Sequence, residues 1–238
     1  MKLDILAIGV HPDDVELGCG GTILKQIALG YKVGIVDLTR GELGTNGSAA
    51  IRAKESEAAR KYAGVLVRDN LKMADGFFEN NKANKLKIIK AIRQYQPDVV
   101  LANAVSDRHP DHGRASLLVS EACFLAGLIK IPTTHKGKKQ KKWRPRKVFH
   151  FIQDHHHEPD IVVDISGHME QKIELVQCFG TQFYNPKKKS TATPISSKAF
   201  LDSLRGRAIA HGRRVGVEFG EGFMCKEYVG VNDLMEVL

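Results

Sequence analysis

The stretch LDILAIGVHPDDVELGCGGT (3–22) joins two kinds of sequence that together decide the fold. Residues 3–10 form an almost continuous apolar run of strand length, which is typical of a strand buried on both faces. A histidine, a proline and two aspartates follow at once, and three glycines lie just beyond them. A buried strand that ends in an imidazole and two carboxylates indicates a functional site at its end.

The same alternation of short apolar runs and amphipathic stretches continues along the chain. Strands are predicted at residues 3–10, 33–39, 98–104, 147–153 and 160–166, with a closing strand within 220–231. Helices are predicted at residues 22–30 (begun by 15–22), 51–64, 83–96, 113–128, 168–179 and 197–213. This order favours an α/β fold, a Rossmann-like three-layer αβα sandwich with a mainly parallel sheet. We expect residues 1–238 to form a single domain, with loops at 129–147 and 183–196.

Composition limits the class of protein. Of the 238 residues, 42% are hydrophobic and 26% are charged, as in an ordinary globular protein. No run approaches the roughly 18 apolar residues of a membrane-spanning helix, and the first strand has no cleavage-like site after it. The four cysteines are widely spaced and form no Cys-x-x-Cys pair. We therefore expect a cytoplasmic protein with reduced thiols and no membrane partner.

The formal net charge of +9 is concentrated in one place. The segment KGKKQKKWRPRK (136–147) holds eight Lys or Arg and no acid, and the charge of the remaining chain is near +1. A nucleic-acid-binding domain would spread its positive charge along a face. We therefore interpret residues 136–147 as a solvated surface loop and expect no nucleic-acid partner. The alternative is that the loop contacts RNA or another anionic partner.

Two short motifs stand just past predicted strand ends. HPDD (11–14) follows the first strand, and HPDH (109–112) follows strand 98–104 and a short loop. Because the carboxyl ends of parallel strands meet at one edge of a sheet, the two motifs can lie side by side. Two histidines and one carboxylate with an open position are a common catalytic zinc set. The alternative is that Asp14 or Asp111 caps a helix, but capping does not require two matching motifs.

These motifs also carry a resemblance to a known family. HPDDVELGCGGT (11–22), RGELGTNG (40–47) and DRHPDHG (107–113) resemble the LmbE/PIG-L family of zinc-dependent N-acetylglucosamine deacetylases. The resemblance spans most of the chain, up to EFGEGF near position 220. Within the family, the chain is most similar to the bacillithiol-biosynthesis deacetylases. The segments RGELGTNGSAAIRAKESEAA, DRHPDHGRA, HEPDIVVDIS and GVEFGEGF support this subgroup.

The resemblance implies an activity and a cofactor. The expected reaction is hydrolysis of the acetamide of N-acetylglucosaminyl-L-malate, which releases acetate and the free amine. One Zn²⁺ per chain is implied, held by His11, Asp14 and His112, and so is a homo-oligomer, with hexamers common among relatives. The alternatives are deacetylation of a free sugar or a chitooligosaccharide, a metal-dependent phosphoesterase on the same scaffold, and a non-enzymatic binder.

The resemblance also implies roles for the remaining motif residues. Asp13 is expected to act as the general base, and His109 is expected to stabilise the developing oxyanion. Asp111 is expected to orient a neighbouring group, either His109 or a metal ligand. The residues alone do not decide whether Asp13 or Asp14 is the ligand, so this choice rests on the resemblance.

Five further residues are candidates for substrate contacts. An arginine at the position of Arg52 reaches the substrate in the family, although a surface helix arginine is the alternative; Arg108 is a second candidate. Glu42 and Asn46 lie in a glycine-rich loop and could hydrogen-bond sugar hydroxyls, or belong to a plain turn. The resemblance places His211 where relatives carry a tyrosine, so an imidazole replaces a phenol at this position.

Overall fold

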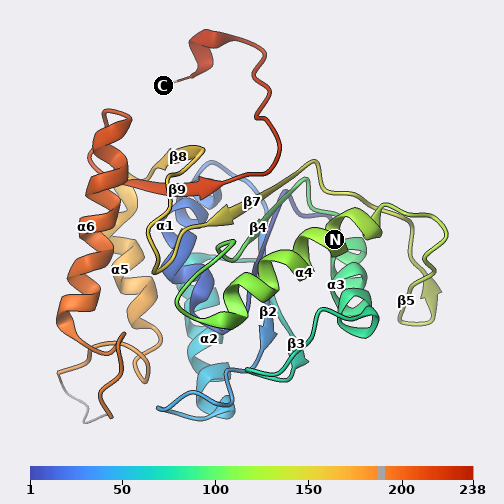
Figure 1. The fold of residues 1–238 in the computed structure, drawn as a ribbon, viewed down its shortest axis with the longest axis horizontal. Helices are drawn as coiled ribbons and strands as arrows, with labels where there is room; N and C mark the ends of the chain where they lie inside the picture. Colours follow the sequence, from blue (N-terminus) through green and yellow to red (C-terminus); the bar gives the residue numbers. More distant parts are fainter. Residues whose placement is uncertain (187–190, 238) are drawn as a thin grey trace.

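The structure, a computed structural model, describes residues 1–186 and 191–237. Within these residues, a seven-stranded sheet runs in the order β3-β2-β1-β4-β7-β9-β8 (Figure 1). Its strands are β1 (Ile5–Gly9), β2 (Val33–Thr39), β3 (Val67–Met73), β4 (Val99–Ala102), β7 (Lys147–Phe151), β8 (Ile161–Asp164) and β9 (Gly220–Met224). In this sheet β9 alone runs against its neighbours, which confirms the mainly parallel sheet predicted from sequence.

Helices cover both faces of the sheet (Figure 1). One face packs against α3 (Lys82–Tyr95) and α4 (Pro110–Ala126). The other packs against α1 (Asp14–Ala28), α2 (Ala49–Ala63), α5 (Met169–Gln177) and α6 (Lys198–Arg214). Alternate side chains of β1 enter the two cores: Leu6 and Ile8 face α3 and α4, and Ile5 and Ala7 face the other side. The expected three-layer sandwich is thereby confirmed.

The chain changes direction across the sheet between β1 and β4. From β1 the strands proceed outward through β2 to β3, and the chain then returns to place β4 on the other side of β1. Helix α1 leaves β1 toward one face, and α4 follows β4 on the opposite face. This arrangement opens a crevice at the carboxyl ends of β1 and β4, where both sequence motifs begin.

Some elements differ from the sequence prediction. Strand β3 was not predicted, because VRDNLKM at the sheet edge is polar and only half-buried. Helix α4 begins inside the second motif, at Pro110 rather than at residue 113, because proline fits the first helical turn. The predicted loop 129–147 contains a small hairpin of β5 (Thr134–His135) and β6 (Lys138–Lys139). Residues 187–190 of the predicted loop 183–196 lie outside the described residues.

Strand β9 fixes the helix that follows the first motif. Helix α1 contains a non-helical residue, Cys19, and the next turn starts afresh beyond it. The Glu221 carboxylate on β9 accepts hydrogen bonds from the backbone N–H groups of Gly21 (2.9 Å) and Thr22 (2.6 Å). Lys172 on α5 donates to the same carboxylate at 2.6 Å. This buried arrangement connects the C-terminal part of the sheet to the helix beside the crevice.

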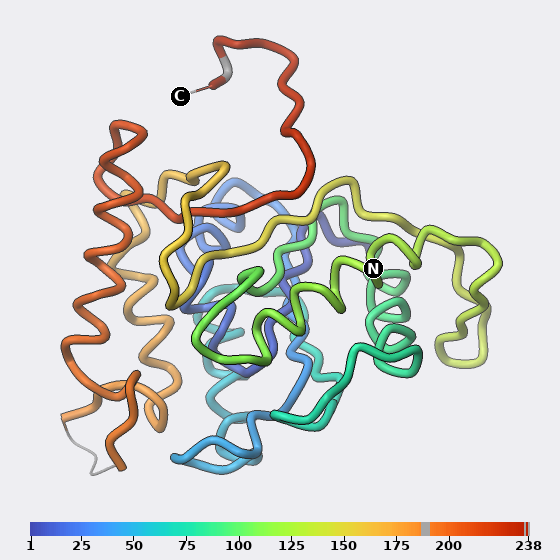
Figure 2. The backbone as a smooth tube through the Cα atoms, in the orientation of Figure 1, coloured from blue at the N-terminus to red at the C-terminus, as the bar shows by residue number. Residues whose placement is uncertain are grey.

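The segment after β9 runs away from the sheet (Figure 2). It ends in a short 3₁₀ helix, η2 (Leu234–Glu236), and another, η1 (Ser166–His168), precedes α5. The basic segment 136–147 lies at the surface, and most of its side chains are exposed. No helix among the described residues is long and apolar enough to cross a membrane.

Candidate metal centre

A pocket of about 260 Å³ opens at the carboxyl ends of β1 and β4. Its volume is near the lower end of the roughly 300–1,000 Å³ typical of small-molecule sites. Both motifs contribute side chains to it: His11, Asp13, Asp14, His109 and His112. The pocket brings together two segments that lie about a hundred residues apart in the sequence.

The Asp14 side chain is held in the pocket by four hydrogen bonds. Its Oδ2 accepts hydrogen bonds from the backbone N–H groups of Val10 (3.0 Å) and His11 (2.9 Å) and from the Asn103 amide (3.0 Å). Its Oδ1 accepts from the Gln153 amide at 3.0 Å. Four donors therefore fix the orientation of one buried carboxylate.

Two histidines approach Asp14 from different motifs. His112 Nε2 lies 3.3 Å from Asp14 Oδ1, and His11 Nδ1 lies 3.6 Å from Asp14 Oδ2. The other nitrogen of each ring has a carboxylate behind it: Asp107 lies 2.6 Å from His112 Nδ1, and Asp75 lies 3.0 Å from His11 Nε2. Histidine ligands of metals are typically oriented by carboxylates in this way.

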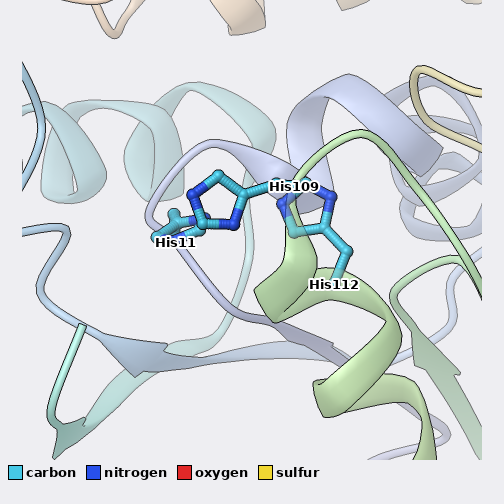
Figure 3. Close-up of side chains that lie close together, drawn as sticks. All are labelled: His11, His109 and His112. Atoms are coloured by element: carbon cyan, nitrogen blue, oxygen red, sulfur yellow. The ribbon is translucent and has the colours of Figure 1, made fainter. Parts of the chain in front are cut away.

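A third imidazole completes the cluster (Figure 3). The ring of His109, at the start of α4, lies 4.6 Å from the ring of His11 and 5.2 Å from that of His112. His109 Nδ1 accepts a hydrogen bond from the backbone N–H of Asp111 at 3.3 Å. Burial and the neighbouring charge of His11 lower the pKa of His109. Because Nδ1 accepts the Asp111 N–H, the ring carries its proton on Nε2, which leaves Nε2–H as a donor.

The charges of the cluster suit a cation. Burial by itself would lower the pKa of His11, but Asp14 and Asp75 raise it to about 10. Burial would also lower the pKa of His112, but Asp14 and Asp107 raise it to about 9. The carboxylates thus favour a positive charge strongly enough to protonate both rings. A divalent ion can replace such protons, so the donor set fits a metal. Ligand atoms of His11, His109 and His112 lie within 4.8 Å of one another, as do those of His11, Asp75 and Asp111.

Asp13 has an unusual backbone and a single strong partner. Its φ is 135° and its ψ is −22°, a region that L-residues rarely adopt. Arg52 Nη2 donates to Asp13 Oδ2 at 2.7 Å and also to the carbonyl of Pro12. Burial raises the pKa of Asp13 to about 7, although the charge of Arg52 opposes this shift. Arg52 therefore holds both the peptide and the side chain of the first motif.

Asp111 is fully buried beneath the pocket. Its Oδ1 accepts from Arg114 at 2.6 Å, and its Oδ2 accepts from the Gly76 N–H at 2.9 Å. Its Oδ2 also lies 3.9 Å from His11 Nε2. The carboxylate thus joins α4 to the turn after β3 and lies close to His11.

The candidate substrate contacts separate into two groups. Arg52 and Arg108 line the pocket, where Arg52 pairs with Asp13 and Arg108 pairs with Asp154. Among the described residues, the pocket is not lined by the other three candidates, Glu42, Asn46 and His211.

Other contacts account for these three side chains. Glu42 accepts hydrogen bonds from the backbone N–H groups of Arg40 (3.1 Å) and Asp75 (3.3 Å), and Asn46 bonds to the backbone of Thr191. His211 is buried on α6 beside a second, small cavity that adjoins the pocket and shares lining residues with it. The structure therefore does not bring Glu42, Asn46 or His211 to the cluster.

The structure adds residues in or beside the pocket that sequence reasoning missed. Two of them, Asn103 and Gln153, are polar residues at the carboxyl ends of predicted strands, the same signal that marked the two motifs. Asp75 follows the unpredicted strand β3, and Asp107 immediately precedes a predicted substrate residue. Arg207 lies in the middle of α6, where no local sequence signal marks it.

Comparison with known proteins finds similarity to several deacetylases and to one hydratase. Residues 6–123 match the PIG-L family, described as GlcNAc-PI de-N-acetylase. A diacetylchitobiose deacetylase from Thermococcus kodakarensis is 30% identical over 189 residues, covering 75% of this chain and 70% of the relative. A probable N-acetyl-alpha-D-glucosaminyl L-malate deacetylase 2 from Bacillus anthracis is 26% identical, with 75% and 81% covered. A 4-oxalmesaconate hydratase from Pseudomonas putida is 25% identical, with 74% and 73% covered.

Two solved structures share the fold of this protein over almost the whole chain. The conserved protein TT1542 from Thermus thermophilus is 34% identical, with a TM-score of 0.85 and coverage of 97% of this chain and 98% of that one. The N,N'-diacetylchitobiose deacetylase from Pyrococcus horikoshii is 28% identical, with a TM-score of 0.77 and coverage of 92% and 82%.

Proposed function

The chain belongs to the PIG-L family of deacetylases, and from that premise we propose that it deacetylates N-acetylglucosaminyl-L-malate. The reaction would hydrolyse the acetamide and release acetate and the free glucosamine amine, a step of bacillithiol biosynthesis. The observation that carries the deacetylase reaction is the approach of His11 and His112 to the fixed carboxylate of Asp14.

The proposed cofactor is one Zn²⁺ per chain, held by His11, Asp14 and His112. Two histidines and one carboxylate are a common catalytic zinc set. Asp14 is preferred to Asp13 because its carboxylate contacts both histidines, whereas Asp13 is paired with Arg52. Bound zinc would lower the pKa of a water molecule and polarise the acetamide carbonyl.

The surrounding side chains have matching proposed roles. Asp13 lines the pocket and is fixed by Arg52, so it can accept the proton of the attacking water and pass it to the departing amine. The Nε2–H of His109 can donate to the carbonyl oxygen as that oxygen gains negative charge. Asp75 and Asp107 keep the rings of His11 and His112 in place.

The malate conjugate is favoured by the charge of the pocket wall. Three arginines line the pocket, and a malate aglycone carries two carboxylates that guanidinium groups bind well. The malate deacetylase relative is also matched over 81% of its length. Free N-acetylglucosamine or a chitooligosaccharide is the alternative substrate, because a diacetylchitobiose deacetylase shows the higher identity.

The test is acetate release by the zinc-loaded protein from N-acetylglucosaminyl-L-malate, free N-acetylglucosamine and diacetylchitobiose. We expect the highest kcat/KM for the malate conjugate and loss of turnover after chelation. Asp13→Asn should retain about one zinc per chain and lose roughly 10²- to 10⁴-fold in kcat.

Asp98→Asn is the matched control, because Asp98 precedes the amino end of β4, whereas the pocket lies at the carboxyl end. Its side chain pairs with Lys2. Its turnover should equal that of the wild type. A preference for a neutral sugar would exclude the malate substrate but keep the deacetylase reaction. Wild-type turnover in Asp13→Asn would exclude the assigned base, and phosphate release from a phosphoester without acetate release would point to a phosphoesterase.

A further inference from the structure

One wall of the pocket is a face of helix α6. Phe200, Leu204 and Arg207 lie four and three residues apart, a spacing that places them on one side of a helix, and all three line the pocket. Phe200 and Leu204 give this wall an apolar surface. Arg207 adds a guanidinium group to the same pocket that holds the histidine cluster.

Arg207 has no partner within the described part of the chain. No hydrogen bond or ion pair joins its guanidinium to residues 1–186 or 191–237, although the side chain is only partly exposed. Burial lowers the pKa of Arg207, and the charges of Asp154 and Asp107 oppose this shift. An arginine stays charged in proteins, and a partly desolvated charge without a partner is unfavourable. An anion from outside the chain would relieve this cost.

The other two arginines of the pocket and two further arginines of this helix are already paired. In the pocket, Arg52 pairs with Asp13 and Arg108 pairs with Asp154. On α6, Arg205 pairs with Glu170 at 2.7 Å, and Arg214 pairs with Glu158. Among the described residues, Arg207 is therefore the pocket arginine that forms no ion pair.

We propose that Arg207 binds a carboxylate of the substrate's aglycone and selects conjugates with an anionic aglycone over neutral sugars. This inference rests on the proposed function, because it assumes that the acetamide is held at the histidine cluster. A guanidinium group and a carboxylate form two parallel hydrogen bonds, which give geometric selectivity as well as affinity. Arg207 then acts as a specificity residue and takes no part in the bond-breaking step.

The test compares two substrates in three variants. Arg207→Met should lower kcat/KM for N-acetylglucosaminyl-L-malate about 10- to 100-fold, chiefly through KM, because a charge-assisted hydrogen bond is lost. The kcat/KM for free N-acetylglucosamine should stay within about twofold, since this sugar carries no carboxylate for Arg207. Arg207→Lys should lie between wild type and Arg207→Met, because an ammonium keeps the charge and loses the fork. Arg205→Met, on the same helix and paired with Glu170, should change neither substrate's kinetics.

A second measurement separates this inference from the proposed substrate. L-Malate should inhibit deacetylation of free N-acetylglucosamine, and Arg207→Met should weaken this inhibition about 10-fold or more. In one outcome, the wild type fails to hydrolyse the malate conjugate while L-malate still inhibits its deacetylation of free N-acetylglucosamine through Arg207. That result would exclude the malate conjugate as the substrate and leave the anion site at Arg207 standing. Calorimetric binding of L-malate replaces the inhibition assay if the wild type releases no acetate from any sugar. Equal losses for charged and neutral substrates, or unchanged malate binding in Arg207→Met, would overturn the role of Arg207.

Discussion

Asp107 Oδ2 lies 2.6 Å from His112 Nδ1, and this contact leaves the second ring nitrogen of His112 facing Asp14. Asp75 stands in the same relation to His11, with 3.0 Å between Asp75 Oδ1 and His11 Nε2. Each proposed ligand histidine thus has one ring nitrogen beside its own carboxylate, Asp107 or Asp75, and the other beside the shared carboxylate of Asp14. Such outer carboxylates fix the ring orientation and raise its basicity.

Removing either outer carboxylate should weaken metal binding. Asp107→Asn and Asp75→Asn should each lower the affinity for Zn²⁺ by about 10- to 100-fold, because a carboxylate no longer orients the ligand histidine. Competition with a chromophoric chelator measures this affinity without relying on turnover. Asp98→Asn serves again as the control far from the pocket. Wild-type affinity in both variants would show that Asp75 and Asp107 do not support a metal site.

The sequence predicts that the two motifs can meet, because the carboxyl ends of parallel strands lie at one side of a sheet. Each motif follows a buried strand, and the two strands are neighbours at the point where the sheet changes direction. Asp75 could not be predicted in this way, because it depends on a polar edge strand, β3, that has no apolar run. Arg207 depends on which face α6 turns to the pocket, and tertiary packing decides this rather than local sequence.

The backbone conformation of Asp13 is expected to lower the stability of the fold. With φ at 135°, any residue other than glycine is strained by about 1–3 kcal/mol. Asp13→Gly and Asp13→Ala both remove the carboxylate and leave Arg52 without its partner, so the difference between them reports the backbone. We expect Asp13→Gly to be more stable than Asp13→Ala by about 1–2 kcal/mol in urea unfolding, and both to be inactive. Equal stability would show that the backbone at Asp13 is not strained in solution.

His150 should make the fold sensitive to mild acid. Burial lowers the pKa of His150; the hydrogen bond with Asn103 opposes this shift and the charge of Lys226 adds to it, so the folded state disfavours the protonated ring. Its Nδ1 donates to the backbone carbonyl of Asn103 at 2.9 Å. In the unfolded chain the pKa returns to about 6.5, and that state binds more protons as the pH falls. The free energy of unfolding should therefore decrease as the pH drops through about 6.5.

Urea unfolding of wild type and His150→Gln between pH 5 and 8 measures this contribution. Glutamine keeps a donor but does not titrate, so the variant should lose less stability than wild type below about pH 6.5. His156→Gln, which removes an exposed imidazole, controls for the loss of one histidine. Parallel curves for wild type and His150→Gln would show that His150 is not buried as a neutral ring.

Two glycines of helices should respond oppositely to alanine. A Cβ on Gly18 in α1 would lie 2.1 Å from the ring of Phe151, a buried side chain of β7. Gly206 in α6 is exposed, and a Cβ there would meet nothing within 4 Å. We expect Gly18→Ala to lower the free energy of unfolding by about 1–3 kcal/mol through overpacking. Gly206→Ala should raise it by about 0.5–1 kcal/mol, because alanine is the better helix former.

The pair separates close packing from helix propensity, since both substitutions add the same methyl group to a helix. A third variant tests the contact itself: Phe151→Leu should cost less in the Gly18→Ala background than in wild type, because the smaller side chain makes room for the added Cβ. Helix α1 begins at Asp14, so displacement of α1 by the clash should also lower the Zn²⁺ affinity of Gly18→Ala while leaving that of Gly206→Ala unchanged. Additive effects of Gly18→Ala and Phe151→Leu would show that the helix and the strand do not touch at this point.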